Sequence, residues 1–406
     1  MSLLSRRRPS PISPSSSSSG LLIGASLLPQ LRGTNLTGGD TFWKNWASKG
    51  GPVAGEDYEF VATKDVDYCL SKGMNTFRLV FGWEALQPQA AQNILQTTGP
   101  FATYRDRLFS LVKYITSKGA FVLLDIHGGD DSTFAAYYGA KVGDVYGRYA
   151  VSDLLVNLWK QLANIFKSNS YVMFGITNEP SGLPTMTWFQ TAQKVIDGIR
   201  TTGARNVIVM PGNYFSGAGS WTYTGGWGDT GKPAKSNGMG WDNANGAGKP
   251  LRDPINNTWI QVHLYVDPDG GGGTGDIQSA RIGADRLKVV TDWARTRGLK
   301  VFVGEVAMAA SNPLAKTCWQ NLVSYIDANR DVVQGFTWWA YGVPAWWGSY
   351  IFTLAPSANY TKDSPQMALI RASFSPSLLP SPPAPAPIPS SPLARRIHTK
   401  ARVRPK

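Results

Sequence analysis

The sequence contains few of the residues that bind metal ions or form covalent cross-links. Only two cysteines, Cys69 and Cys318, occur among 406 residues, and neither lies in a metal-ligand or redox motif. The pair is compatible with one disulfide or with two buried thiols. The segment DPDGGGGTGD, residues 267–276, resembles a calcium loop, but position twelve is Gln278 instead of the glutamate that completes such a loop. We interpret the segment as a flexible glycine loop, and we predict neither a metal site nor a cofactor.

Long hydrophobic runs are also missing from most of the chain. The segment GLLIGASLL, residues 20–28, has the composition of a signal-peptide core behind Arg6, Arg7 and Arg8, although nineteen residues precede it. No other apolar run approaches the length of a membrane span. We therefore expect a secreted, extracellular protein without a membrane span. An organellar transit segment is the alternative interpretation of a start that is rich in Arg and Ser and free of acids.

Acidic residues are absent from both ends of the chain. Residues 1–30 and 373–406 contain nine of the 40 basic residues and no acid, so only +4 of the net charge of +13 belongs to the residues between them. Both ends are also rich in Pro and Ser and have too little apolar surface to offset the entropy cost of folding. We predict a disordered or targeting segment over 1–30, one folded domain over 31–370 and a disordered basic tail over 371–406.

The charge distribution also limits the possible partners. A nucleic-acid surface needs basic residues clustered on one helix or groove, and the middle of the chain has no such cluster. We therefore expect no nucleic-acid partner for the folded domain, and any role of this kind would be confined to the tails.

Between the tails, short β-rich apolar runs alternate with longer segments of helical periodicity. This alternation predicts βα units and a parallel sheet, and eight such runs favour an α/β fold of the closed (β/α)8, or TIM, barrel type. An open doubly wound sheet is the rival, but GTNLTGGD after the first run lacks the G-x-G-x-x-G spacing. The segment 214–258 has a poor helical pattern and predicts active-site loops with an irregular fifth helix. The eight runs are 31–36, 75–81, 120–127, 171–179, 206–213, 259–265, 301–305 and 332–342.

Polar, titratable and aromatic residues lie where several of these runs end. The carboxyl ends of barrel strands share the face that carries the site, so these side chains should meet there. The fourth run, YVMFGITNE, ends on Asn178 and Glu179, and the seventh ends on Glu305. A carboxylate at the end of an apolar strand is costly to desolvate, so it is either paired or kept there for chemistry. The other candidates are Arg78, His127, His263, Tyr265, Trp338 and Trp339.

Two carboxylates that face one cleft from separate strands are the groups that glycosidic bond cleavage requires. One protonates the leaving oxygen, and the other attacks the sugar or activates water. A retaining mechanism predicts carboxyl groups about 5 to 5.5 Å apart, and an inverting one roughly 6.5 to 9.5 Å. Asn178 is placed to hydrogen-bond a sugar 2-hydroxyl, and Tyr265 and Arg78 could hold Glu305 ionised.

Each of these residues and motifs could also have a purely structural role. Asn-Glu-Pro is a weak tripeptide on its own, a lone histidine is often a core residue bonded to backbone, and the tryptophans of WWAYGVPAWWG could be ordinary core aromatics. Exposed tryptophans would instead be sugar-stacking subsites. The joint position of these residues at the ends of six strands favours the functional interpretation.

Over residues 31–370 the chain resembles glycoside hydrolase family 5, and within it the endo-β-1,4-glucanases (cellulases) of subfamily 5. The resemblance is carried, in the family's order, by LRGTNLTGG, FRLVFGWEALQP, LLDIH, FGITNEPSG, VMPGNYFSGAGSW, VHLYVDPDGGGGT, VGEVAMAA and WWAYGVPAWWGSYIF. It implies a catalytic domain with Glu179 as general acid/base and Glu305 as the nucleophile of a retaining enzyme. It further implies a supporting and substrate-binding set of Arg78, His127, Asn178, His263, Tyr265 and Trp339, with Trp338 as the alternate to Trp339.

The resemblance implies a metal-independent endoglucanase, which we expect to be a monomer, that cleaves internal bonds of cellulose or a related soluble β-glucan by double displacement. One departure affects the substrate. Residues 128–133, GGDDST, replace the Asn and Tyr that usually follow the strand-three histidine. Mannan, mixed-linkage glucan or xyloglucan are therefore alternative substrates, and a non-catalytic carbohydrate-binding barrel is the alternative of a different class. Because the Pro-rich tail leads only to a short basic peptide, we expect weak activity on crystalline cellulose.

Overall fold

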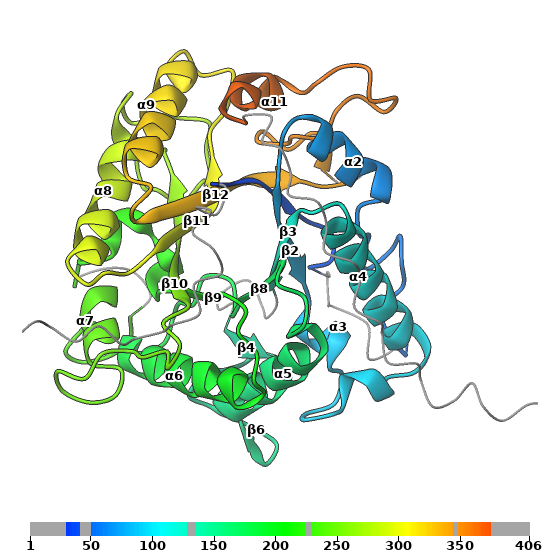
Figure 1. Ribbon diagram of the computed structural model, residues 1–406, viewed down its shortest axis with the longest axis vertical. Coiled ribbons are helices and arrows are strands. Elements are labelled where there is room, and N and C mark those ends of the chain that lie inside the picture. The colour runs from blue at the N-terminus through cyan, green and yellow to red at the C-terminus, as the bar shows by residue number, and fades with distance from the viewer. Residues whose placement is uncertain (1–29, 41–49, 128–134, 225–228, 344–346, 375–406) are drawn as a thin grey trace, which may run out of the picture.

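Eight parallel strands form a closed barrel in the computed structural model (Figure 1), which describes residues 30–40, 50–127, 135–224, 229–343 and 347–374. The strands follow the order β1-β12-β11-β10-β9-β8-β3-β2 around the barrel. Each predicted run contributes one of them, so the predicted (β/α)8 barrel is confirmed. The barrel strands are β1 Leu31–Leu36, β2 Thr76–Phe81, β3 Phe121–Ile126, β8 Val172–Gly175, β9 Ile208–Pro211, β10 Thr258–Tyr265, β11 Val301–Ala307 and β12 Val333–Tyr341.

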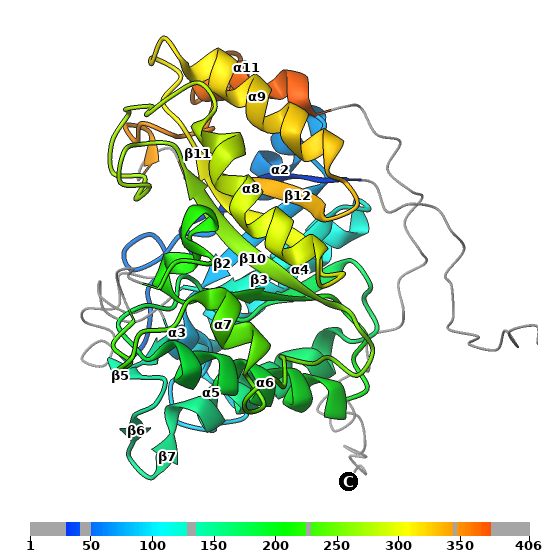
Figure 2. The same ribbon diagram turned by 90° about the vertical axis from the view of Figure 1, so that its left-hand side faces the viewer.

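Helices surround the barrel (Figures 1 and 2) and alternate with its strands along the chain. None of the helices in the described ranges is long and apolar enough to span a bilayer. The helices are α2 Thr63–Ser71, α3 Trp83–Leu86, α4 Gly99–Ser117, α5 Val151–Phe166, α6 Thr185–Thr201, α7 Asn237–Asp242, α8 Ile282–Arg295, α9 Ala315–Ala328 and α11 Pro365–Ile370. Single 3-10 turns are η1 Ile94–Gln96, η2 Tyr214–Ser216, η3 Ala218–Ser220 and η4 Arg371–Ser373.

The segment between β9 and β10 is irregular, as its sequence predicts. It contains the turns η2 and η3 and the six-residue helix α7 instead of a long helix. The predicted tails over 1–30 and 371–406 lie almost entirely outside the described residues. The limits of the folded domain, 31–370, stay a prediction.

The connection from β3 to α5 carries two small hairpins at the edge of the molecule (Figure 2). They are formed by β4 Ala136–Tyr137 with β5 Ala140–Lys141 and by β6 Val145–Tyr146 with β7 Tyr149–Ala150. The altered loop that the sequence places at 128–133 lies outside the described residues, so its effect on substrate choice stays a prediction.

Strand β8 is shorter than its apolar run predicts. The run continues to Glu179, but the strand ends at Gly175. Beyond that point the backbone leaves the regular ladder: the amide of Asn178 still donates to Ile126 O at 2.8 Å, and Glu179 has a left-handed φ of 36°. An apolar run indicates that a segment is buried, and burial continues past Gly175. A strand also requires the repeating hydrogen bonds of a ladder, and these stop at Gly175. The prediction of the strand's end was therefore wrong by four residues.

The interior of the barrel changes from apolar to polar toward the carboxyl ends of the strands. An apolar layer at the amino ends comprises Leu31, Leu123, Met173, Val209, Trp259 and Phe302. Asp125 and Gln261 lie two residues beyond Leu123 and Trp259 on β3 and β10 and contact each other, and Asp125 also contacts Arg78 of β2. All three polar residues are fully buried. Gly304 leaves space for this polar layer, because a Cβ there would lie 2.9 Å from Cγ and Cδ of Gln261. The floor of the barrel mouth is therefore charged, although it is closed to solvent.

Both cysteines are buried and unpaired in the structure. Cys69 lies in α2 and Cys318 lies in α9. The sequence left open whether they form a disulfide, and the structure assigns two buried thiols. Burial raises the pKa of both thiols, so neither is poised for thiolate chemistry.

Candidate active site

Arg78 is the centre of a buried hydrogen-bond network under the barrel mouth. Its Nε donates to Asp125 Oδ2 at 2.6 Å, and its Nη2 donates to Asn178 Oδ1 at 2.6 Å. Its Nη1 donates to Asn35 Oδ1 at 2.8 Å and to Glu305 Oε1 at 2.7 Å. Burial alone would lower the pKa of Arg78, but the carboxylates of Asp125 and Glu305 outweigh it and raise the pKa. A permanent cation thus lies beneath the candidate catalytic groups.

Both oxygens of Glu305 are held by donors. Arg78 donates to Oε1, and the Tyr265 hydroxyl donates to Oε2 at 2.5 Å. Glu305 lies on β11 and is 4% exposed. A register shift between Val262 and His263 places His263 directly beside Glu305 in the β10–β11 pair. The carboxylate is therefore fixed in orientation, and donors compensate its charge from two sides.

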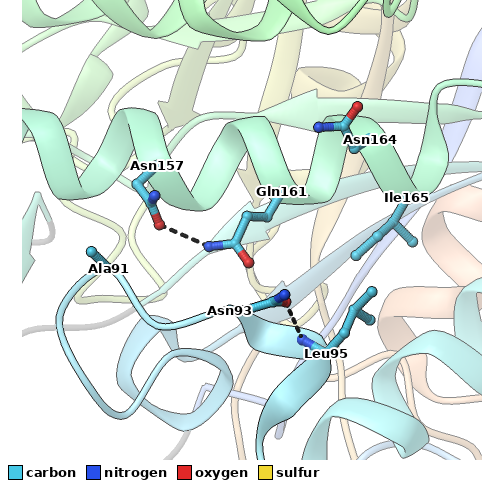
Figure 3. A pocket seen from close by; sticks show the side chains of 7 residues that line it. All are labelled: Ala91, Asn93, Leu95, Asn157, Gln161, Asn164 and Ile165. Carbon is cyan, nitrogen blue, oxygen red and sulfur yellow. Dashed lines mark hydrogen bonds between the residues drawn. The ribbon is translucent and has the colours of Figure 1, made fainter.

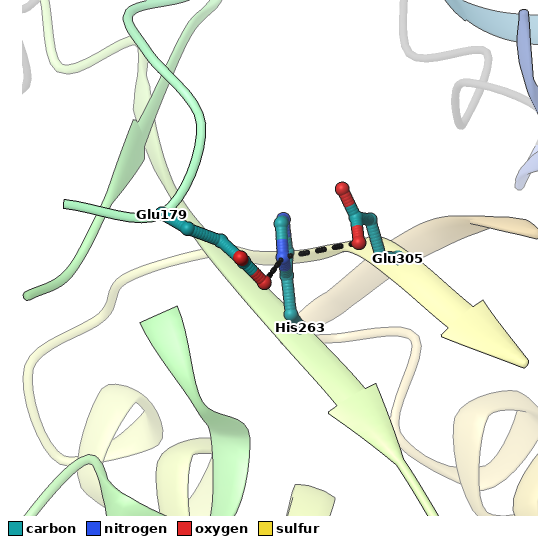
Figure 4. Close-up of side chains that lie close together, drawn as sticks. All are labelled: Glu179, His263 and Glu305. Carbon is teal, nitrogen blue, oxygen red and sulfur yellow. Dashed lines mark hydrogen bonds and ion pairs between the residues drawn. The ribbon is translucent and has the colours of Figure 1, made fainter. Parts of the chain in front are cut away.

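Glu179 lies across the mouth from Glu305 in a different environment (Figure 4). Its Oε1 is 2.6 Å from Nδ1 of His263, and its side chain is 17% exposed. Burial raises the pKa of Glu179 to about 7, although the charge of Arg78 opposes the shift. A carboxyl group with such a pKa can hold a proton under mildly acidic conditions and release it near neutrality.

His263 lies between the two glutamates (Figure 4). Its Nδ1 is 2.6 Å from Glu179 Oε1 and 3.4 Å from Glu305 Oε2. Burial lowers its pKa to about 3; Glu305 opposes this shift and Arg78 adds to it. The imidazole is therefore neutral at ordinary pH, and its Nδ1 can accept a hydrogen bond from protonated Glu179 or donate one to that carboxyl, depending on its tautomer. One ligand atom from each of the three residues lies within 4.8 Å of the others.

Glu179, His263 and Glu305 form the one group in the described part of the chain with three converging side chains of metal-binding types. The hydrogen-bond partners that these side chains already have favour acid–base chemistry over metal binding. Glu305 is engaged by Arg78 and Tyr265, and Glu179 is engaged by the imidazole. This arrangement suits two carboxyl groups that take different parts in acid–base chemistry, and the expectation of metal independence stays a prediction.

His127 and Trp339 lie together at the mouth. Their rings are nearly parallel, with centroids 5.6 Å apart and an interplanar angle of 7°. Trp339 is partly exposed, whereas Trp338 is fully buried and donates its Nε1 hydrogen to Phe352 O at 2.8 Å. Of the two tryptophans, only Trp339 can therefore present a ring face to a ligand. Burial lowers the pKa of His127 well below its usual range, and Arg78 and His263 add to this effect.

Four buried or half-buried polar residues of the site were not singled out from the sequence. Asn35 and Asp125 accept from Arg78, Gln261 donates to Asp125 Oδ2 at 3.2 Å, and Asp40 Oδ2 lies 3.9 Å from His127 Nδ1. Two of them could have been found from the sequence, because a polar residue inside an otherwise apolar run, such as the aspartate in LLDIH or the glutamine in WIQVHLY, indicates a buried polar site.

Phe215, which contacts the segment that carries Glu179, was also not singled out from the sequence. It is 42% exposed, its amide donates to Pro180 O at 3.2 Å, and it has a left-handed φ of 55°. Its neighbours Tyr214 and Ser216 are left-handed as well. Three consecutive left-handed residues without a glycine have no sequence signature, since such a turn is held by its surroundings.

A separate hollow lies on the outside of the barrel between η1 and α5 (Figure 3). It is lined by Ala91, Asn93, Leu95, Asn157, Gln161, Asn164 and Ile165, none of which is titratable. Several of its amide groups are already engaged: Gln161 Nε2 donates to Asn157 Oδ1 at 2.7 Å, and Asn93 Oδ1 accepts from the Leu95 amide at 3.0 Å. The hollow lacks the groups for acid–base chemistry, which the barrel mouth contains.

A parallel (β/α)8 barrel with two convergent carboxyl groups at the ends of its strands has the architecture of a glycoside hydrolase. Residues 30–342 match the family model described as cellulase, glycosyl hydrolase family 5. The chain belongs to this family, as its sequence motifs predict.

Named relatives and solved structures agree with this assignment. Endo-beta-1,4-glucanase B of Aspergillus niger is 32% identical over 305 residues, which cover 75% of this chain and 80% of that protein. The crystal structure of the endo-beta-1,4-glucanase Xac0029 from Xanthomonas axonopodis pv. citri is 31% identical with a TM-score of 0.72, and the match covers 85% of this chain and 98% of that one. The structure of XacCel5A in complex with cellopentaose is 33% identical with a TM-score of 0.71, over 85% of this chain and 99% of that one.

Proposed function

We propose that this protein is a retaining endo-β-1,4-glucanase in which Glu179 is the general acid/base and Glu305 is the nucleophile. The observation that carries the proposal is the close approach of two carboxyl groups in opposite environments, with one oxygen of each within 4.8 Å. An inverting enzyme needs roughly 6.5 to 9.5 Å between its carboxyl groups to admit a water molecule. The short separation supports direct attack by one carboxylate on the sugar.

The first chemical step forms a glycosyl-enzyme ester. Glu305 attacks the anomeric carbon while Glu179 gives its proton to the glycosidic oxygen, which leaves with the departing chain. Glu305 is suited to the first role because Arg78 and Tyr265 fix both of its oxygens. Glu179 is suited to the second because its raised pKa, about 7, keeps it protonated below neutrality.

The second step releases the sugar. Glu179, now ionised, removes a proton from water, the resulting oxygen attacks the anomeric carbon, and the ester bond to Glu305 breaks. His263 lies 2.6 Å from Glu179 Oε1 and is neutral, so it can donate a hydrogen bond from Nδ1 to the ionised form. The imidazole thus holds the acid/base in place in both of its protonation states.

Asn178 and Trp339 are the proposed sugar contacts. The carboxamide oxygen of Asn178 is occupied by Arg78, so its NH2 group is the part left to donate to a sugar 2-hydroxyl. Trp339 offers a ring face beside His127, against which a pyranose ring can stack. A β-1,4-glucan as substrate is further supported by the cellopentaose bound to XacCel5A, a structure 33% identical to this chain.

The alternative of a non-catalytic carbohydrate-binding barrel is less well supported. Binding of sugar alone requires stacking rings and hydroxyl partners, whereas this chain gathers a half-buried carboxyl group with a buried carboxylate, arginine and neutral histidine at one point. Burial of such groups costs stability and is typical of catalytic sites. Mannan, mixed-linkage glucan and xyloglucan remain alternative substrates, because the altered loop over 128–133 borders the site in sequence.

The test is reducing-sugar release from carboxymethylcellulose, β-mannan and xylan by the full chain, with Glu305→Gln as control. We expect release from the cellulose derivative, abolished by the substitution, and little release from crystalline cellulose. Proton NMR of the first product should show the β-anomer, as retention requires. Release from mannan alone would change the substrate assignment, and no release by the folded protein would favour the binding barrel.

We also propose that the protein is secreted and monomeric. Secretion is supported by Arg6, Arg7 and Arg8 followed by the apolar segment 20–28. The monomeric state extends the expectation from the sequence. Amino-terminal sequencing of protein recovered from culture medium and sedimentation equilibrium would test the two statements, and retention inside the cell or a dimer would contradict them.

A further inference from the structure

Gly272 lies over the face of the Tyr265 ring. A Cβ at position 272 would lie 2.5 Å from Cδ1 of Tyr265, 2.6 Å from Cε1 and 2.7 Å from Cγ. Nearly equal distances to three consecutive ring atoms place this point above the face of the ring and not at its edge. Gly272 also has a left-handed φ of 73°. The position therefore requires glycine for two independent reasons, its conformation and its contact with the ring.

A buried carboxylate holds Gly272 in this place. Asp267 is 2% exposed, and its Oδ1 accepts from the Gly272 amide at 3.1 Å. Its Oδ2 accepts from the amides of Gly273 at 3.1 Å and Thr274 at 3.4 Å. Three consecutive amides of the loop 267–274, named here the Asp267 loop, thus converge on one side chain. The sequence interpretation of this segment as a flexible glycine loop missed that network.

Arg286 anchors the other end of the Asp267 loop. It lies on α8 and donates from Nη1 to the carbonyl oxygens of Tyr265 and Asp267, the latter at 2.8 Å. Its Nη2 donates to Pro268 O at 3.0 Å. The loop is therefore tied at its start to a barrel helix and at its end to Asp267.

The Tyr265 ring is confined by these contacts. It is 8% exposed, and the ring of Phe352 lies nearly parallel to it, with centroids 6.5 Å apart and an interplanar angle of 27°. Because an aromatic ring is rigid, a displacement imposed at Cδ1 moves the hydroxyl oxygen as well. That hydroxyl donates to Glu305 Oε2 at 2.5 Å. The conformation of the Asp267 loop is thus coupled to the orientation of the proposed nucleophile.

We propose that Asp267 and Gly272 are positioning residues for the hydrolytic reaction, which hold the Tyr265 hydroxyl against Glu305. This proposal rests on the proposed function, since it assigns Glu305 the role of nucleophile. The loop acts through Tyr265: it keeps one of the two donors to Glu305 in place before the sugar is attacked. Preorganised donors of this kind contribute to catalysis because they need not reorient during the reaction.

The test compares Gly272→Ala with two matched controls. Gly271→Ala alters the same loop, but its Cβ would have no neighbour nearer than Asp269 Oδ1 at 3.4 Å. Gly55→Ala reproduces the left-handed strain, at a φ of 83°, in open space. For Gly272→Ala we expect kcat to fall about tenfold or more, because a hydrogen bond to a charged group is lost. KM should change much less than kcat, because the displaced Tyr265 hydroxyl acts on Glu305, the group that attacks the sugar in the transition state.

A second substitution shows whether the loop acts through the hydroxyl. In a Tyr265→Phe background no hydroxyl remains to be misplaced, so Gly272→Ala should add little to the effects of Tyr265→Phe. Asp267→Asn, which replaces one acceptor by a donor facing backbone amides, should likewise lower kcat with much less change in KM. If circular dichroism shows that Gly272→Ala does not fold, Asp267→Asn serves as the test instead.

The outcomes separate this proposal from the proposed function. Unchanged kinetics in folded Gly272→Ala or Asp267→Asn, with an active parent enzyme, would overturn the positioning role. Fully additive effects of Gly272→Ala and Tyr265→Phe would overturn it too. Absence of hydrolysis by the parent enzyme on all substrates would instead overturn the proposed function.

Discussion

Oε1 of Glu179 lies 2.6 Å from Nδ1 of His263, and burial shifts the pKa values of the two groups in opposite directions. The pKa of Glu179 rises to about 7, and that of His263 falls to about 3. Between these values the carboxyl is protonated and the imidazole is neutral, so the carboxyl can donate to the ring nitrogen. The contact therefore stores the catalytic proton on Glu179, from which it can pass to a leaving group.

The first prediction concerns the alkaline limb of the pH–rate profile. Glycosidic cleavage needs Glu179 protonated, so kcat/KM should fall as the pH rises through about 7, the pKa of that carboxyl. Glu179→Gln should remove this limb and reduce hydrolysis of unactivated glucan by about 10²-fold or more. An aryl cellobioside with a good leaving group should lose much less in its first step, which burst kinetics would measure. Retention of the limb in Glu179→Gln would assign it to another group.

The second prediction concerns stability. The pKa of Glu179 rises from 4.5 to about 7 on folding, so the unfolded chain loses this proton first as the pH increases. The folded state should therefore lose stability relative to the unfolded chain between pH 4.5 and about 7. Glu179→Gln should be more stable than the parent at pH 8, by on the order of 1–3 kcal/mol, and similar to it at pH 4. Urea unfolding at both pH values measures this, with the exposed Glu56→Gln as control. An equal effect at both pH values would contradict the ionisation argument.

The third prediction concerns Arg78. Arg78→Lys keeps the charge but cannot reproduce the four hydrogen bonds that reach Asp125, Asn35, Glu305 and Asn178. We expect a loss of about 2–5 kcal/mol in the free energy of unfolding, because several hydrogen bonds are lost and those to charged groups are worth about 1.5–3 kcal/mol each, together with a large fall in kcat. The 71% exposed side chain of Arg281 offers the matched control Arg281→Lys, for which both values should hardly change. Near-wild-type stability of Arg78→Lys would show that charge alone suffices.

The fourth prediction separates the two adjacent tryptophans. Trp339→Ala should raise KM for cello-oligosaccharides about tenfold through the loss of ring stacking. Trp338→Phe should leave KM unchanged but lower stability by about 1–3 kcal/mol, because it removes the hydrogen bond to Phe352 O and leaves a gap in the core. Steady-state kinetics and thermal unfolding of both variants would measure these effects. A raised KM in Trp338→Phe alone would exchange the two assignments.

The barrel could be predicted from the sequence because its strands are buried on both faces. The run WIQVHLY, residues 259–265, corresponds to β10 almost residue for residue, since the hydrogen-bonded ladder and the predicted run both end at Tyr265. In β8 the same reasoning misplaced the end, because burial continues beyond Gly175 after the ladder has stopped. The locations of Glu179 and Glu305 were predictable because a carboxylate at the end of an apolar run is rare unless it has a partner or a function.

What the sequence could not provide was the set of contacts among residues distant along the chain. Arg78 was recognised as a site residue, but its bonds to Asn35 and Asp125 depend on the register in which β1, β2 and β3 pair. The hydrogen bond from Gly272 to Asp267 could not be predicted for a similar reason, since a glycine-rich segment has the same composition whether it is ordered by such bonds or flexible. Local composition reports what a segment can do, and the packing around it decides what it does.

The position of Arg78 has a consequence for the electrical work of the reaction. When Glu305 becomes an ester, its negative charge disappears, and Glu179 acquires one as it gives up its proton. The total charge around the buried guanidinium is therefore the same before and after the bond is cleaved, although the negative charge has moved from Glu305 to Glu179. An immobile cation with fixed partners can serve both states without being solvated anew, so the water that the second step requires need reach only the mouth and not the barrel interior beneath it.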